Sequence, residues 1–215
     1  NFGSGNPLLT APPGGDKERD EATGLAYGDG KIYVSYGKRN LVGVFDGVSG
    51  QLETTWTVPA PGALAARPDG SVVAVSKGQL VSVAGGQVAP LAATDLDTPS
   101  GIAVAADGTI YVSNRGARQD IAVLDGSGKL RRRIGKAGGR PAVGNYDPSG
   151  VYMPGGLALD VQNRLWVAEH ADGPKRISVW KAATGVLDRE FFGGSSYFGY
   201  ACINPAVPTE IYCHN

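Results

Sequence analysis

Short apolar segments alternate with polar turns along most of this chain, and within each segment apolar and polar positions alternate as in half-buried β-strands. One unit recurs: a Gly or Ala, a short apolar strand, a polar turn, and a strand of β-branched and aromatic residues. Its copies begin near residues 24, 63, 101, 156 and 201. The turn is Asp-Gly in the first three copies, a strong hairpin signal because glycine tolerates positive φ.

Three copies continue with two more strand segments each, at 41–45 and 51–56, at 120–124 and 129–134, and at 176–180 and 186–192. Four antiparallel strands at a spacing of about 40 residues are typical of propeller blades. The third unit is longer than the others, which indicates an insertion. The pattern therefore predicts an all-β propeller of four-stranded antiparallel blades. A sandwich of unrelated hairpins would not repeat one order of features five times.

The repeats divide the chain into about four and a half blades. Residues 1–20 are expected to form an N-terminal segment or the end of a preceding blade, and 21–215 the propeller. The blades are predicted near 21–61, 62–99, 100–154 and 155–199, with a partial blade at 200–215. The chain starts at Asn1, without an initiator Met, and stops soon after a strand begins. We expect a processed chain or a fragment of a longer one.

Composition narrows the choice of partners. The chain has 20 basic and 20 acidic side chains and a formal net charge of zero, which disfavours nucleic acid as a partner. No apolar run approaches the roughly 20 residues that a membrane span needs, so no membrane span is predicted. Arginines 131–133 fall on a predicted outermost strand, where charges commonly protect a sheet edge. Binding of single-stranded RNA on a basic face is the alternative.

Two segments carry a resemblance to a known family. Residues 100–114, and 156–169 followed by 176–180, resemble NHL repeats, and the first blade lies between NHL and YVTN-type repeats. The resemblance implies a ring that usually closes with six blades, so the remaining strands would come from outside this chain or from another chain. Segments 138–142, 175–180 and 189–193 also resemble large NHL-like proteins of bacterial envelopes. That likeness implies an exported protein, extracellular or in the cell envelope.

The predicted topology gathers one set of loops on one face of the ring, here named the top face. It consists of loops 36–41, 76–80, 114–120 and 169–176 and the connections 57–62, 91–100, 136–155 and 193–200. Tyrosines on such a rigid face suit a protein, peptide or carbohydrate ligand. The alternative is that these rings pack the corners between blades. The candidate ligand-binding residues are Tyr146, Tyr152, Tyr197, Phe198, Tyr200, Arg115, Arg118 and His170.

An enzyme is the competing class. Gluconolactonase-like propellers hold a divalent ion at the channel mouth, and the resemblance would place ligands at Thr23, Gly62, Ser100, Gly155 and Tyr200. None of these is Asp, Glu or Asn, the oxygen donors that a hard cation needs. The amidating lyase of the NHL group uses several histidines, and this chain has two. We predict no metal and no cofactor. A lyase or lactonase-like hydrolase completed by blades outside this chain stays open.

Glu169 and His170 are the strongest candidates in the sequence for a catalytic acid–base pair. A lone histidine without a neighbouring nucleophile or second carboxylate is a weak catalytic signal. The structural interpretation is that Glu169 holds the following loop, with Arg176 as its partner. The pattern as a whole favours a non-catalytic binding or scaffolding module.

The two cysteines, Cys202 and Cys213, occupy core-type positions of the last hairpin. Buried thiols are one interpretation, and a cross-strand disulfide is the other. A distant likeness to a haem-attachment motif lacks the usual Cys-x-x-Cys-His spacing.

Overall fold

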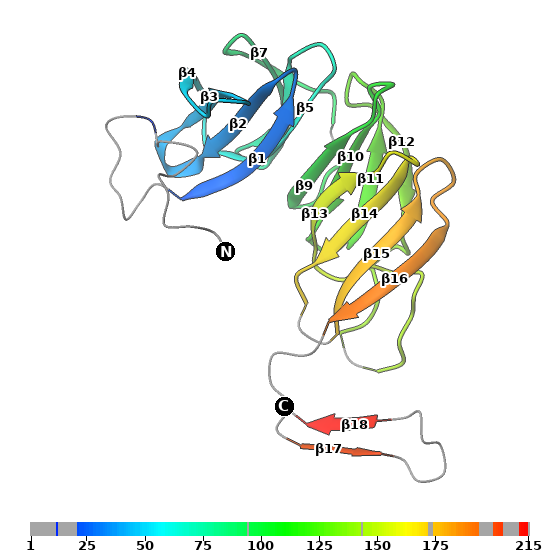
Figure 1. The fold of residues 1–215 in the computed structure, drawn as a ribbon. Helices are drawn as coiled ribbons and strands as arrows, with labels where there is room; N and C mark the ends of the chain where they lie inside the picture. The colour runs from blue at the N-terminus through cyan, green and yellow to red at the C-terminus, as the bar shows by residue number, and fades with distance from the viewer. Residues whose placement is uncertain are drawn as a thin grey trace.

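The computed structural model describes residues 12, 21–93, 95–142, 144–171 and 174–193, and the backbone of 200–203 and 211–214. Four four-stranded antiparallel sheets form the blades of a β-propeller, as the repeats predict (Figure 1). Within each blade the strands follow chain order, from the inner strand outward. A two-stranded sheet, β17 (Tyr200–Ile203) and β18 (Ile211–His214), follows them in the chain.

The strand bounds define the four blades. Blade one contains β1 (Ala22–Gly28), β2 (Lys31–Tyr36), β3 (Leu41–Asp46) and β4 (Leu52–Thr57), with a short 3-10 turn, η1 (Gly37–Arg39), before β3. Blade two contains β5 (Pro61–Ala66), β6 (Val72–Ser76), β7 (Gln79–Ala84) and β8 (Gln87–Pro90). Blade three contains β9 (Pro99–Val104), β10 (Ile110–Asn114), β11 (Asp120–Leu124) and β12 (Leu130–Ile134). Blade four contains β13 (Pro154–Leu159), β14 (Arg164–Glu169), β15 (Lys175–Lys181) and β16 (Leu187–Gly193).

The sequence pattern predicts these strands to within a residue or two, because alternation and turn residues are local signals. The sequence analysis gives no separate bounds for the last two strands of blade two, β7 and β8; the turn between them is Gly85-Gly86, with both glycines at positive φ. The arginines at 131–133 do lie on the outermost strand of blade three. No helix in the described ranges is long and apolar enough to cross a membrane.

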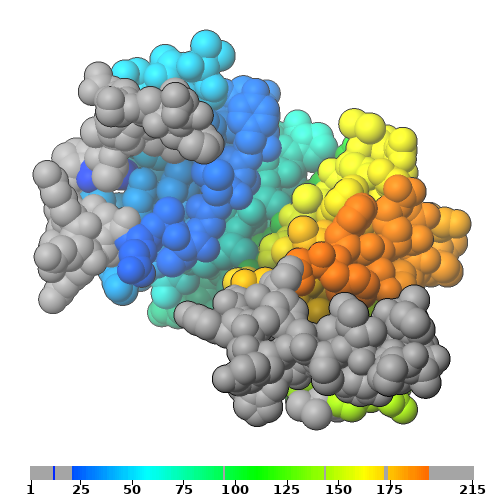
Figure 2. All heavy atoms as spheres, turned by 60° about the horizontal axis from the view of Figure 1, so that its bottom comes forward, coloured from blue at the N-terminus to red at the C-terminus, as the bar shows by residue number. Residues whose placement is uncertain are grey.

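The inner strands line up around the ring, where β1 contacts β5, β5 contacts β9 and β9 contacts β13. Figure 2 shows the same order from another side, with blade one in blue, blade two in teal and blade four in yellow and orange. Between neighbouring blades lie the hydrophobic cores. Alternating residues of one blade face the previous blade and the others face the next, since side chains alternate across a strand.

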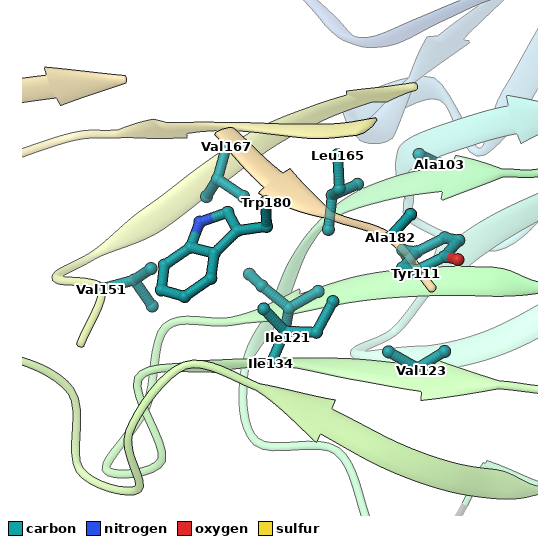
Figure 3. Close-up of a cluster of buried hydrophobic side chains, with 10 residues drawn as sticks. All are labelled: Ala103, Tyr111, Ile121, Val123, Ile134, Val151, Leu165, Val167, Trp180 and Ala182. Atoms are coloured by element: carbon teal, nitrogen blue, oxygen red, sulfur yellow. The ribbon is translucent and has the colours of Figure 1, made fainter. Parts of the chain in front are cut away.

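The core between blades three and four is typical of this packing. Tyr111, Ile121 and Ile134 of blade three lie against Leu165 and Trp180 of blade four (Figure 3). Burying an apolar side chain of this size stabilises the fold by about 1.5–3 kcal/mol. Similar cores join blades one and two and blades two and three.

Hydroxyl groups add polar links at the inner strands. In blade one, Oγ1 of Thr23 donates to the carbonyl oxygen of Pro61 at 2.7 Å, and Oγ of Ser35 donates to that of Gly62 at 2.6 Å. Blade three repeats this arrangement toward blade four. There Ser100 and Ser113 donate to the carbonyl oxygens of Pro154 and Gly155, both at 2.7 Å.

Candidate functional site

Hydrogen bonds hold the loops of the top face against the connections between blades. The backbone N–H of Val58 donates to the carbonyl oxygen of Asn40 at 3.0 Å in blade one. In blade four, the N–H of His170 donates to the carbonyl oxygen of Met153 at 3.0 Å. The loops and connections that the topology predicted to share a face are therefore adjacent in these blades.

Glu169 ends β14 with its carboxylate fully buried. Its Oε1 accepts a hydrogen bond from Nη1 of Arg176 at 2.8 Å. Its Oε2 accepts from Nε of Arg140 at 3.0 Å and from the backbone N–H of Tyr152 at 3.1 Å. The predicted pairing with Arg176 is confirmed. Both carboxylate oxygens are engaged, so this arrangement is suited to holding loops and not to exchanging a proton with a substrate.

Arg176, at the start of the third strand of blade four, is fully buried as well. Its Nη1 donates to the carbonyl oxygen of Gly150 at 2.7 Å, and its Nη2 donates to that of Pro148 at 2.8 Å. Its Nε donates to Oε2 of Glu190 on β16 at 2.9 Å. The guanidinium thus ties the connection 136–155 to three strands of blade four, with its planar set of donors filled.

Tyr146 of the same connection lies above this charged cluster. Its ring centroid is 5.8 Å from Cζ of Arg140 and 5.7 Å from Cζ of Arg176, within cation–π range. Its hydroxyl donates to Oε2 of Glu190, and Phe192 packs edge-on at 5.6 Å. Burial and then the bond to Glu190 raise the pKa of Tyr146. The hydroxyl is therefore a hydrogen-bond donor over the ordinary pH range.

Tyr152 also contacts Arg140, whose Cζ lies 5.5 Å from the ring centroid. Both tyrosines therefore make the contacts that corner packing requires. Tyr146 is nevertheless 42% exposed, which leaves part of its ring accessible from outside. Ligand binding by either ring stays a prediction.

Arg118 lies in blade three within a separate ionic cluster. It forms an ion pair with Asp95, and Nη2 of Arg133 donates to the same carboxylate at 2.7 Å. The bond from Arg133, followed by the positive charge of Arg118, holds the pKa of Asp95 below its usual range. The backbone N–H of Arg118 donates to Oδ2 of Asp97 at 3.0 Å. Its guanidinium thus already has an ionic partner, Asp95, in the connection between blades two and three.

Gln119 links the remaining two candidates through the backbone. Its Nε2 donates to the carbonyl oxygen of Arg115 at 2.7 Å, and its Oε1 accepts from the N–H of Met153. The carbonyl oxygen of Met153 in turn accepts a hydrogen bond from the backbone N–H of His170. The imidazole of His170 lies over Gly155, where an added methyl group would come within 2.3 Å of Nε2.

The structure therefore places both described tyrosines around Glu169 and Arg118 beside Asp95, and it connects the backbone of Arg115 and His170 through Gln119 and Met153. No cluster of three or more His, Cys, Asp or Glu side chains that could hold a metal occurs in the described part of the chain. Tyr197 and Phe198 lie outside the described residues, as does the side chain of Tyr200. The register of the last hairpin places Cys202 opposite Tyr212 and Cys213 opposite Ala201, and the disulfide stays a prediction.

Sequence reasoning missed Arg140, Glu190 and Asp95 as partners in these clusters. In the sequence, Arg140 falls within segment 138–142, which is noted only for its resemblance. Its partner Glu169 is 29 residues away, on a strand that the insertion separates from it. A run of charges does not reveal such pairs, because they depend on how the connection folds back over the blade.

The chain matches no known protein family and no curated protein sequence. Among solved structures, 818 chains match it, so the likeness identifies an architecture that many proteins share. One is hydrazine synthase from Kuenenia stuttgartiensis, with a TM-score of 0.62 and 18% sequence identity. The alignment covers 96% of this chain and 57% of that one, so this chain spans little more than half of its length. At this identity the likeness shows the β-propeller fold alone.

Proposed function

We propose that these blades serve as a non-catalytic binding and scaffolding module in a larger propeller of an exported bacterial protein. One observation carries the proposal: residues that are buried between blades inside the array have exposed counterparts on its two outermost faces. A scaffold that docks further blades, or another chain, needs such faces.

The free face of blade one contains Leu25. It occupies the repeat position of Leu64 and Ile102, which are 4% and 6% exposed between blades, yet Leu25 is 67% exposed. Tyr27, two residues further along β1, is 69% exposed. These side chains stand where a preceding blade would pack.

The free face of blade four contains Ile177, Phe191 and Trp166. Ile177 takes the repeat position of Ile121, which is completely buried, and is itself 44% exposed. The rings of Trp166 and Phe191 stack at 5.7 Å and 8°. A cavity of about 540 Å³ borders Ile177, Phe191 and His170. This apolar, aromatic composition matches that of the cores between blades.

The non-catalytic part of the proposal is supported by Glu169, the strongest acid–base candidate, because both of its oxygens are held by buried partners. For ligand capture we assign the top face around Tyr146, together with Tyr197 and Tyr200. Replacing Tyr197 and Tyr200 by Ala should weaken capture of a protein, peptide or carbohydrate ligand without unfolding the blades. Unchanged capture would remove the top face from the proposal.

The mass of the purified protein tests the scaffold. Native mass spectrometry should give an assembly larger than 22.1 kDa, and the denatured mass tells whether the extra blades belong to the same polypeptide or to another. Leu25→Asp and Phe191→Asp should weaken that assembly or destabilise the ring. Val48→Asp is the matched control, because Val48 is 93% exposed on a turn. A stable monomer of 22.1 kDa in both measurements would rule out the scaffold.

A further inference from the structure

A groove of about 740 Å³ opens between blades one and two. It lies on the side of the Asp-Gly turns, away from the top face. One wall consists of β4 and of Lys31 and Tyr33 on β2. The other wall is formed by blade two, with Asp69, Gly70 and the Gly85-Gly86 turn. The groove is thus built from strands and tight turns, which hold its shape before a ligand arrives.

The indole of Trp56 gives the groove an apolar surface, and Tyr33, only 1% exposed, supports it from the core. Tyr33 and Trp56 lie 5.5 Å apart at 38°. Tyr33 is held in place by its hydroxyl, which donates to the carbonyl oxygen of Gly70 at 3.3 Å. Gly86 passes close to the indole, since an added methyl group there would lie 3.2 Å from Cδ1 of Trp56. Trp56 is half-buried, so part of its indole remains available to a ligand.

Around these rings stand groups that exchange hydrogen bonds. Lys31 and Glu53 form an ion pair in which each side chain is 37% exposed. Asp29 and Asp69 add carboxylates, and the threonines of β4 and Gln87 add groups that both donate and accept. Three carboxylates against one ammonium make the groove acidic, so an anionic ligand would be repelled.

The equivalent space between blades three and four explains why this groove is open. There Gly185 takes the place of Gly86 and lies against Arg132 and Ile134. Arg132 crosses the gap and donates to the carbonyl oxygen of Ala182. In blade three, Arg132 on β12 pairs with Val123 on β11. The corresponding pair in blade one is Thr54 on β4 with Val44 on β3. A short threonine instead of an arginine therefore leaves the space between blades one and two accessible.

We propose that this groove binds a neutral oligosaccharide. A pyranose ring has an apolar C–H face that suits the half-buried indole of Trp56, which Tyr33 supports, and hydroxyls that both donate and accept. The carboxylates of Asp29 and Glu53 accept from those hydroxyls, and the ammonium of Lys31 donates to them. This site goes beyond the proposed scaffold and requires only blades one and two, so it holds whether or not further blades close the ring.

The test titrates the full chain with cellohexaose, maltohexaose, xylohexaose and chitohexaose, following heat and tryptophan fluorescence. At least one should bind with a Kd below about 1 mM, and trigalacturonate, which is anionic, should bind more weakly. Thr54→Arg should fill the groove as Arg132 fills its counterpart and weaken binding by at least about tenfold. Thr184→Arg, which adds the same charge on an exposed turn of blade four, is the control.

Glu53→Gln should weaken binding several-fold, although the groove beside Thr54 stays open in this variant. The proposal is overturned if none of the four neutral saccharides binds, or if Thr54→Arg binds as tightly as the unaltered chain. Binding of a lysine-containing peptide in the groove with no saccharide binding would also overturn it, in favour of a cationic ligand. The native mass is recorded on the same samples, so loss of the scaffold is distinguished from loss of the groove.

Discussion

Ser113 of blade three donates its hydroxyl to the carbonyl oxygen of Gly155 in blade four over 2.7 Å, across 42 residues of sequence. Ser35 makes the same contact from blade one to Gly62 of blade two. The corresponding positions of blades two and four are Val75 and Ala168, which have no hydroxyl. The blades are therefore linked in pairs by the same polar contact.

Removing that hydroxyl should destabilise the paired blades. We expect Ser113→Ala to lower the free energy of unfolding by about 1–3 kcal/mol, because the buried Gly155 carbonyl loses a donor. Ser35→Ala should act similarly, and the double variant should lose roughly the sum, since the two sites share no partners. Urea unfolding measures this. An effect no larger than that of Ser49→Ala, on an exposed turn, would contradict the link.

In each linked pair of blades, one glycine on an inner strand should not tolerate a larger side chain. An added methyl group at Gly101 would lie 2.0 Å from the carbonyl oxygen of Gly155, and at Gly24 it would lie 2.4 Å from that of Gly62. Gly101→Ala should therefore cost at least about 1–3 kcal/mol through overpacking. Gly156→Ala at the same repeat position of blade four is the matched control, since no atom lies within 4 Å there. Thermal unfolding of the two variants should differ clearly.

The buried carboxylate of Glu169 should be essential to the fold of blade four. Glu169→Gln leaves the guanidinium groups of Arg140 and Arg176 buried without their anion, and breaking such a pair costs about 3–5 kcal/mol. Glu190→Gln should cost less, because Glu190 is partly exposed. Chemical denaturation gives both values. Equal effects for the two variants would show that burial of the charge is not what makes Glu169 important.

Stability should fall in acid through the turn carboxylates, with Asp160 as the clearest case. Its Oδ2 accepts from Nε1 of Trp166 at 2.9 Å and Nε of Arg164 at 2.7 Å. The bond from Trp166 leads the effects that hold the pKa of Asp160 well below its usual range. Because the folded pKa is depressed, its contribution is complete above the unfolded value of about 3.9 and is lost as pH falls below it.

Asp160→Asn therefore should differ most from the unaltered chain near pH 7, and the difference in melting temperature should shrink between about pH 4 and pH 2. Melting curves recorded across that range test the sign. A difference that grows in acid would mean that the carboxylate does not favour the folded state.

The architecture and the candidate site differ in how far the sequence predicts them. The polar turns and the alternating segments around them are local signals, and they locate the strands of blades one, three and four closely. The pairing of Glu169 with Arg176 was also within reach, because both flank the same short loop. The role of Arg140 was not, since its insertion carries no periodic pattern.

By itself, the sequence determined the number, order and antiparallel pairing of the blade strands, because hairpins form between neighbouring segments whose turn chemistry can be read directly. Only the tertiary structure decided which groups meet across the loops and blades: Ser113 with Gly155, Arg140 with Glu169, and Arg132 with Ala182, whereas the equivalent space beside Thr54 stays open. The angle and spacing between packed blades place those residues together. No local pattern encodes that spacing, because it depends on the combined volume of two faces that are far apart in the chain.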